Sequence, residues 1–384
     1  MSVELYDHEF DYAMSTVRSV LEFIGAWPLP ASSSIATKIT YRLKRVATYF
    51  LFLFTIVPTV LFALFKTQNT RTRLKLVGPI FNSTMQLVKY SIVLYHVENI
   101  RKCMDLFHRD WLNSNEQDRQ ILRSKAQIGR KLVWISIVFM YGGGLCYRTI
   151  VPILKGKIVT PQNITIRPLS CPGYFVLFNE QTTPFYELVF LLQFFSGLVS
   201  YAITTGGCGI SAFLVLHVCS QLRMLINKMK ELGEGKNFDD ETVQQKLVSI
   251  IEHQTKTKGY LKHTQAITQY ISFCEVLNGT ILSCLAGYCI IMEWESSNTA
   301  ATFTYAIFLL CFTFCRYNVG LTSITINWYR LPVRKARNLV FIIAMSHKPM
   351  KLVAGKMLEM SFATFTDIMK LSMGYLNILR KAEL

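Results

Sequence analysis

Charged residues are scarce in this sequence. Asp, Glu, Lys and Arg make up 17% of the 384 residues, whereas 51% are hydrophobic. An ordinary soluble domain carries about 25% charged residues. The apolar residues gather in long runs separated by basic segments, which is the pattern of a membrane protein. We therefore expect one bundle of membrane-crossing helices rather than two or three soluble domains.

Motifs of enzymes and of metal sites are also missing. No GxSxG elbow, HExxH helix, paired-carboxylate site or phosphate-binding glycine loop stands out. The ten cysteines lie mostly in apolar runs, with no CxxC pair, and are expected to pack in the core. Gly206-Gly207-Cys208-Gly209 resembles a phosphate loop, but no Lys-Ser or Lys-Thr follows it, so we interpret it as close helix packing. The sequence predicts no enzyme, cofactor or metal.

The net charge of +17 does not have the pattern of a nucleic-acid-binding protein. The basic residues lie between apolar spans rather than along one face with stacking aromatic residues. Membrane topology and contact with anionic membrane lipid explain them without nucleic acid. Residues 1–45 lack the features of a cleavable signal peptide, so we expect this segment to stay attached.

Seven membrane spans are predicted from the apolar runs. The fourth is longer than the roughly 20 residues that a bilayer requires, so its helix must tilt or project. The last is split by the turn His347-Lys348-Pro349. The predicted fold class is an all-α membrane protein with seven transmembrane helices at 46–65, 76–95, 132–154, 185–218, 266–292, 301–322, and 338–345 with 361–379.

Lys and Arg are distributed unevenly between the two sides of these spans. The segments 1–45, 96–131, 217–265 and 323–361 hold 28 of them, and the segments of the opposite side hold 7. The positive-inside rule predicts a cytoplasmic N-terminus and, with seven spans, an extracellular C-terminus. The sequon Asn163-Ile164-Thr165 falls in an outer loop, which makes Asn163 a glycosylation candidate.

Charged and polar residues inside the spans are functional candidates. Glu275 and Arg316 are costly in lipid and should face protein or water. In the final segment, polar positions fall on one helical face, and the residues on it are Asp367, Lys370, Gly374, Asn377 and Lys381. This face predicts either the lining of an aqueous pore or an amphipathic helix on the membrane surface.

Aromatic residues and a methionine gather in the outer halves of the spans. They can enclose a small apolar molecule and offer Tyr hydroxyl groups, although most such residues in a bundle serve packing alone. The candidate ligand-binding residues are Phe81, Met85, Tyr141, Tyr147, Phe190, Phe194, Tyr305 and Phe308.

The C-terminal part of the chain resembles the signature of the insect odorant-receptor family. Ile24-Gly25-Ala26-Trp27-Pro28 is similar to the family's glycine-tryptophan-proline motif before the first span, and His253 lies in the long basic loop. Asn327 and Gly374 depart from the family pattern. The C-terminal residues that carry the resemblance are Trp328-Tyr329, Arg337, Lys348-Pro349, Ala354-Gly355, Ser361, Phe365, Lys370, Ser372, Tyr375 and Leu379.

The resemblance implies a subunit of a tetrameric cation channel that is gated by small volatile organic molecules. In that family, ligand-specific subunits assemble with a shared odorant receptor co-receptor, in the plasma membrane of olfactory sensory neuron dendrites. The co-receptor has a much longer loop than 217–265, so this chain resembles a ligand-specific subunit. Ile378 is expected to form the hydrophobic gate, with Gly374 and Asn377 nearby along the pore.

The implied organisation has four parts: a cytoplasmic segment 1–45, a ligand-binding bundle of six helices 46–322, a cytoplasmic anchor for subunit assembly 323–360 and a pore-lining helix 361–384. Three other classes stay open. A gustatory receptor of the same superfamily has the same architecture and a soluble ligand. A G-protein-coupled receptor needs the opposite orientation, and a transporter is disfavoured because no internal repeat is visible.

Overall fold

The structure is a computed structural model of the whole chain. The described residues include most of the first 295 positions and a few near the C-terminus. They are residues 2–30, 32–145, 148–149, 152–153, 156, 158–159, 165–176, 178–234, 240–295, 353–354 and 358–359, and the single positions 367, 370, 371, 374, 375 and 378. The predicted spans 301–322 and 338–345 lie outside this set.

Helices dominate the described residues. The first part of the chain forms α1 (Ser2–Phe23), α2 (Ile35–Leu61) with a short π-helix, α3 (Thr70–Tyr95), α4 (Val97–Leu112) and α5 (Glu116–Leu145). The two long helices are α7 (Phe185–Glu234) and α8 (Asp240–Glu295). Two antiparallel hairpins have strands of two residues each, pairing β1 (Ile158–Val159) with β2 (Thr165–Ile166) and β3 (Val353–Ala354) with β4 (Leu358–Glu359).

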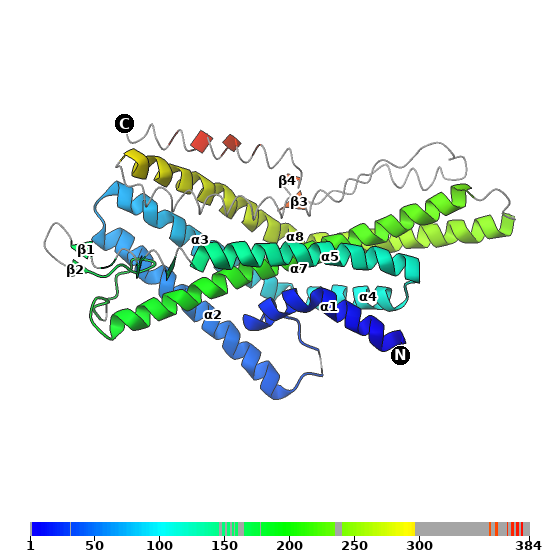
Figure 1. The fold of residues 1–384 in the computed structure, drawn as a ribbon, viewed down its shortest axis with the longest axis horizontal. Coiled ribbons are helices and arrows are strands. Elements are labelled where there is room, and N and C mark those ends of the chain that lie inside the picture. The colour runs from blue at the N-terminus through cyan, green and yellow to red at the C-terminus, as the bar shows by residue number, and fades with distance from the viewer. Residues whose placement is uncertain are drawn as a thin grey trace.

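Helices α7 and α8 run along the whole length of the molecule (Figure 1). With 50 and 56 residues, they are about 75 and 84 Å long at 1.5 Å per residue. Helix α5 packs along α7, and α3 packs against α8. Because a bilayer core is only about 30 Å thick, both long helices must extend well beyond the membrane, as the length of the fourth apolar run predicts.

Three helical stretches in the described part of the chain are long and apolar enough to cross a membrane: Ile35–Lys66, Phe185–Leu232 and Gln244–Ile290. Helix α2 shows the membrane pattern most clearly. Its exposed face carries Val46, Phe50 and Val57, whereas its buried face includes Thr55 and Thr59, whose hydroxyl groups donate to carbonyl groups of their own helix. Apolar side chains outside and satisfied polar groups inside suit a helix solvated by lipid.

The motif Ile24-Gly25-Ala26-Trp27-Pro28 ends α1. Gly25 has φ of +68°, its N–H donates to Glu22 O, and Ala26 N–H donates to Leu21 O, which together form a Schellman motif. From α2, Lys44 Nζ donates to Glu22 O and Arg45 Nε to Gly25 O. The sequence motif therefore turns the chain and joins α1 to α2.

Helix α1 lies against α5 and α7 rather than in solvent. Its buried residues Phe10, Met14, Val17 and Leu21 belong to the main hydrophobic core. This role of residues 1–45 was not predicted. The spacing of three and four residues between these apolar positions is the signal that indicates a buried helical face.

Two basic segments that we treated as loops are largely helical. Helix α4 and the first half of α5 occupy 96–131, and the ends of α7 and α8 occupy most of 217–265. Helix α4 buries Ile100, Cys103, Met104, Phe107 and Trp111, a helical spacing beneath a charged outer face. The treatment of these segments as loops was wrong because charge was given more weight than periodicity.

Candidate functional site

Two tyrosines and a glycine lie where the C-terminal half of α5 meets the N-terminal half of α7. The rings of Tyr141 and Tyr201 meet edge to face, with centroids 5.6 Å apart. A Cβ on Gly144 would lie 2.3 Å from the Tyr201 ring, so only glycine lets this ring approach α5. Tyr141 was predicted to line the ligand pocket, whereas Tyr201 was missed because a single sequence does not show which face of α7 meets α5.

The segment before α7 is tied to the same outer region. Gln193 is 1% exposed, and its side chain donates to Cys171 O while accepting from Cys171 N–H. Arg148 Nη1 donates to Gln193 O, and Tyr186 Oη donates to Pro168 O. These bonds fix a cover over the C-terminal end of α5 and the N-terminal end of α7, in the region where the ligand pocket was predicted.

Five of the eight predicted ligand-binding residues are described. Phe81 and Met85 lie on α3, Tyr141 on α5, and Phe190 and Phe194 on α7, and all five are partly buried. The Phe190 ring stacks on Tyr186, and the Phe194 ring contacts Phe195. Three helices therefore contribute candidates. Tyr147, Tyr305 and Phe308 lie outside the described residues, as does the sequon residue Asn163.

The predicted pore positions are described only in part. Asp367, Lys370, Gly374 and Ile378 are helical and exposed in the single chain. Leu371 and Tyr375 are helical and exposed as well, so the pore-lining face stays a prediction. Asn377 lies outside the described residues.

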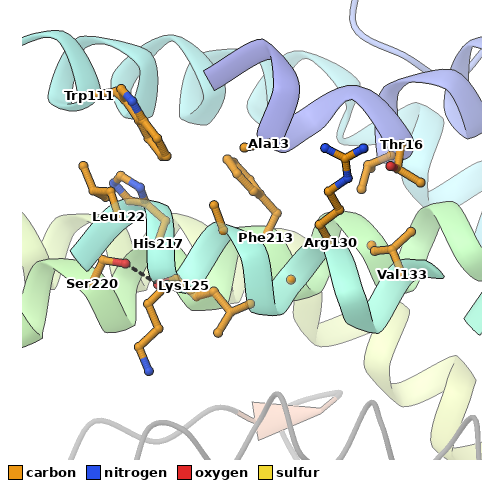
Figure 2. Close-up of a pocket in the computed structure, with 15 residues that line it drawn as sticks. Ala13, Thr16, Trp111, Leu122, Lys125, Arg130, Val133, Phe213, His217 and Ser220 are labelled. Carbon is orange, nitrogen blue, oxygen red and sulfur yellow. Dashed lines mark hydrogen bonds between the residues drawn. The ribbon is translucent and has the colours of Figure 1, made fainter. Parts of the chain in front are cut away.

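A small cavity lies in the other half of the molecule, between α1, α4, α5 and α7 (Figure 2). Trp111, Leu122 and His217 lie at one end of it, and Arg130 lies towards the other. Its volume of about 20 Å³ has room for little more than one water molecule. None of the five described ligand-binding candidates lines this cavity, and it is too small for an odorant.

Two opposite charges meet inside the bundle. Lys89 Nζ on α3 lies 2.5 Å from Glu275 Oε1 on α8, and the lysine side chain is 2% exposed. The sequence marked Glu275 as costly in lipid and therefore facing protein or water, which the structure bears out. Its partner was missed because pairing depends on how α3 and α8 pack.

A second polar cluster joins α4, α7 and α8 in the half that holds the cavity. Asp110 is buried and accepts from Lys256 Nζ at 2.5 Å and from Gln221 Nε2 at 3.0 Å. His217 Nε2 lies 3.4 Å from the same carboxylate. Burial raises the pKa of Asp110, but its hydrogen bonds to His217 and Lys256 outweigh burial and hold the pKa below its ordinary value. The carboxylate therefore stays ionised and ties three helices together.

His253 bridges the two long helices. Its Nε2 lies 2.9 Å from Gln221 O, and its Nδ1 lies 3.3 Å from Lys228 Nζ. Because a carbonyl oxygen only accepts, Nε2 carries the proton and Nδ1 accepts from the lysine. His253, which was predicted to lie in a loop, thus holds the hairpin of α7 and α8 together.

The fold is that of a class of seven-helix membrane proteins. Two structures of the insect olfactory receptor OR5 from Machilis hrabei are similar to this chain, each at 11% identity. The complex with eugenol has a TM-score of 0.78, covering 98% of this chain and 99% of that one. The other has a TM-score of 0.72, covering 97% and 98%. This likeness shows the seven-transmembrane fold.

The chain belongs to the insect odorant receptor family, because the family model described as 7tm Odorant receptor matches residues 69–373. Odorant receptor Or1 of Anopheles gambiae is 22% identical, with 94% of each chain covered. Odorant receptor 30a of Drosophila melanogaster is 19% identical over 60% of this chain, and the match spans 61% of that protein. The predicted family and the seven-helix class are confirmed.

Proposed function

We propose that this protein is the ligand-specific subunit of an odorant-gated cation channel and assembles with the shared odorant receptor co-receptor. The observation that carries the proposal is the family match over residues 69–373. Members of this family are membrane-embedded, ligand-gated channels rather than enzymes. The proposed location is the plasma membrane of olfactory neuron dendrites.

The proposed ligand is a small volatile molecule that binds in the outer half of the bundle. Support comes from the partly buried Phe81, Met85, Tyr141, Phe190 and Phe194 on α3, α5 and α7. Phenyl rings and a thioether offer apolar contact, and the tyrosine offers one hydroxyl group. A ligand that binds the open state more tightly than the closed state shifts the receptor towards opening.

The proposed orientation puts the N-terminus in the cytoplasm, and the proposed pore is formed by 361–384, with 323–360 as the cytoplasmic anchor. The exposed helical face of Asp367, Lys370, Gly374 and Ile378 supports this role for the last segment. In a channel gated by dewetting, a ring of Ile378 side chains closes the pore to water and ions.

Whole-cell current tests the function. Cells receive this chain, the co-receptor or both, and a panel of volatile alcohols, esters, aldehydes and terpenes is applied. A rapid cation current that requires both chains is the expected result. No current from the pair, despite surface labelling of both chains, contradicts the proposal.

The gate is tested in the same cells with Ile378→Ser. A small polar side chain wets the constriction, so the ligand-free current should rise well above that of the wild type. Ile378→Leu, which keeps an apolar side chain of the same size at this position, is the matched control and should leave the ligand-free current near that of the wild type. If the wild type and Ile378→Ser have equal ligand-free currents, Ile378 does not form the gate.

A further inference from the structure

The ion pair between α3 and α8 lies deep in the described bundle. Lys89 and Glu275 lie about 30 Å inward from the outer ends of their helices, Thr70 and Glu295, at 1.5 Å per residue. Both residues therefore stand at a similar depth, in stretches predicted to cross the membrane. A charge at such a depth is costly, so a charged residue there indicates a function in which its ion-pair partner takes part.

Polar side chains extend the pair to α7. Thr204 Oγ1 accepts from Lys89 Nζ at 3.4 Å and from Gln86 Nε2 at 2.8 Å. One turn outward from Gln86, Asn82 Oδ1 accepts from Asn278 Nδ2 of α8 at 3.1 Å. Two turns of α3 are thus joined to α7 and α8 by polar contacts.

This polar layer is only partly satisfied. Gln86 and Asn278 are 2% and 1% exposed, yet Gln86 Oε1 and Asn278 Oδ1 accept no hydrogen bond from the described residues. A partly satisfied buried network is less favourable than an apolar core. A buried ion pair is often replaceable by apolar residues with no loss of stability. Holding the fold together is therefore a poor reason for these residue types.

The position of the pair suggests what else it does. Phe81 and Met85, which we propose to contact the ligand, lie on α3 one to two turns outward from Lys89. Glu275, the other member of the pair, belongs to α8, a continuous helix of 56 residues. Helix α8 contacts β3 (Val353–Ala354), which precedes the proposed pore segment 361–384. The pair thus lies between the proposed pocket and the helix that reaches the pore region.

We propose that Lys89 and Glu275 are positioning residues whose ion pair fixes α3 against α8 and so sets the balance between the closed and open channel. The inference rests on the proposed function. If ligand binding displaces α3, the contact has a different free energy in the closed and in the open channel. That difference contributes to the equilibrium between the two states. A ligand shifts that equilibrium only through its different affinities for the two states.

Four variants test the pair in cells that also express the co-receptor. Glu275→Gln removes one charge, and Lys89→Met with Glu275→Leu replaces both by apolar side chains. Lys89→Glu with Glu275→Lys exchanges them. Thr268→Val is the matched control on α8, because Thr268 is buried and its hydroxyl group donates to Thr264 O of its own helix.

Three quantities are measured for each variant: surface labelling, ligand-free current, and the half-maximal concentration of an agonist taken from the volatile panel. The apolar double variant should reach the surface as the wild type does, yet shift the half-maximal concentration by about tenfold, within the usual range of coupling between sites. Glu275→Gln should shift it as well. The exchanged pair should restore most of the wild-type half-maximal concentration. Thr268→Val should have the same half-maximal concentration as the wild type.

Either of two results overturns the inference. One is an apolar double variant with wild-type ligand-free current and agonist sensitivity, which would leave the pair a purely structural contact. The other is an exchanged pair whose half-maximal agonist concentration is no closer to the wild-type value than that of Glu275→Gln.

A silent wild type would contradict the proposed function, and with it the gating role, but the contact is tested without current. Thermal unfolding of the purified complex of both subunits then compares Lys89→Glu with the exchanged pair. The exchange should recover the stability that Lys89→Glu loses, and failure to recover it would overturn the contact itself.

Discussion

A single glycine decides how the N-terminal helix meets the membrane bundle. Gly25 has φ of +68°, and a Cβ at this position would lie 3.0 Å from both Lys44 Cβ and Tyr41 O. The left-handed conformation costs an L-residue about 1–2 kcal/mol. The crowding against α2 comes in addition, because backbone and Cβ atoms cannot rotate away.

We therefore predict that Gly25→Ala destabilises the receptor by clearly more than the backbone strain alone. Gly156 is the matched control, because its φ is +58° but nothing lies within 4 Å of its Cβ position. Gly156→Ala should cost about 1–2 kcal/mol at most. Thermal unfolding of purified receptor measures both variants, and equal losses would show that α2 does not crowd Gly25.

Asp110 makes the receptor's stability depend on pH. Its folded-state pKa lies below the ordinary value of about 3.9, so the unfolded state binds the proton more readily in acid. The stabilisation is present above the ordinary pKa and is lost as pH falls through the folded-state pKa. Asp110→Asn should therefore be less stable than the wild type at pH 7, by about 1–3 kcal/mol.

The difference in melting temperature between Asp110→Asn and the wild type should narrow as pH falls from 5 to 3. Asp105→Asn, an exposed position on the same helix, serves as the control and should follow the wild type at every pH. A difference for Asp110→Asn that stays constant down to pH 3 would show that the carboxylate is not held ionised by its partners.

At the scale of elements, glycines set how closely helices approach. The interpretation of Gly206-Gly207-Cys208-Gly209 as a packing motif agrees with the structure: a Cβ on Gly206 would lie 2.7 Å from Leu21 and one on Gly209 would lie 2.9 Å from Val17. Both contacts are with α1, a helix that was not among the predicted apolar spans. The motif showed that a partner exists, but only the fold shows which one.

Gly209→Ala should destabilise the receptor by about 1–3 kcal/mol, the usual cost of overpacking. The added methyl group meets Val17 and Val133, whose β-branched side chains have little rotamer freedom. Gly259→Ala on α8 is the counterpart, since nothing lies within 4 Å of its Cβ position, and it should stabilise by up to about 1 kcal/mol. Unfolding temperatures that move in the same direction would refute the packing argument.

The sequence predicted elements better than contacts. Apolar runs located α2, α3, α7 and the outer part of α8, because lipid imposes length and hydropathy on each helix separately. Helix α4 was missed, although its buried positions follow the helical period. The pairing of Lys89 with Glu275 and of Tyr141 with Tyr201 depends on packing between distant segments, which one sequence does not encode locally.

At the scale of the whole molecule, α7 and α8 extend about 45 and 54 Å beyond a bilayer core of about 30 Å. The basic segment 217–265, which contains their connection, belongs to the side with 28 Lys and Arg. The positive-inside rule puts that side in the cytoplasm, so the α7–α8 hairpin should project into the cell together with α1 and α4.

Epitope tags test this orientation. One tag is placed at the N-terminus, a second replaces 235–239 between α7 and α8, and a third is inserted beside the exposed Gly156. The first two should bind antibody only after the cells are permeabilised, and the third should bind on intact cells. Because the N-terminus of a G-protein-coupled receptor faces outward, labelling of the N-terminal tag on intact cells would reverse the topology. In that case the hairpin would lie outside, and the charge distribution would need an explanation other than the positive-inside rule.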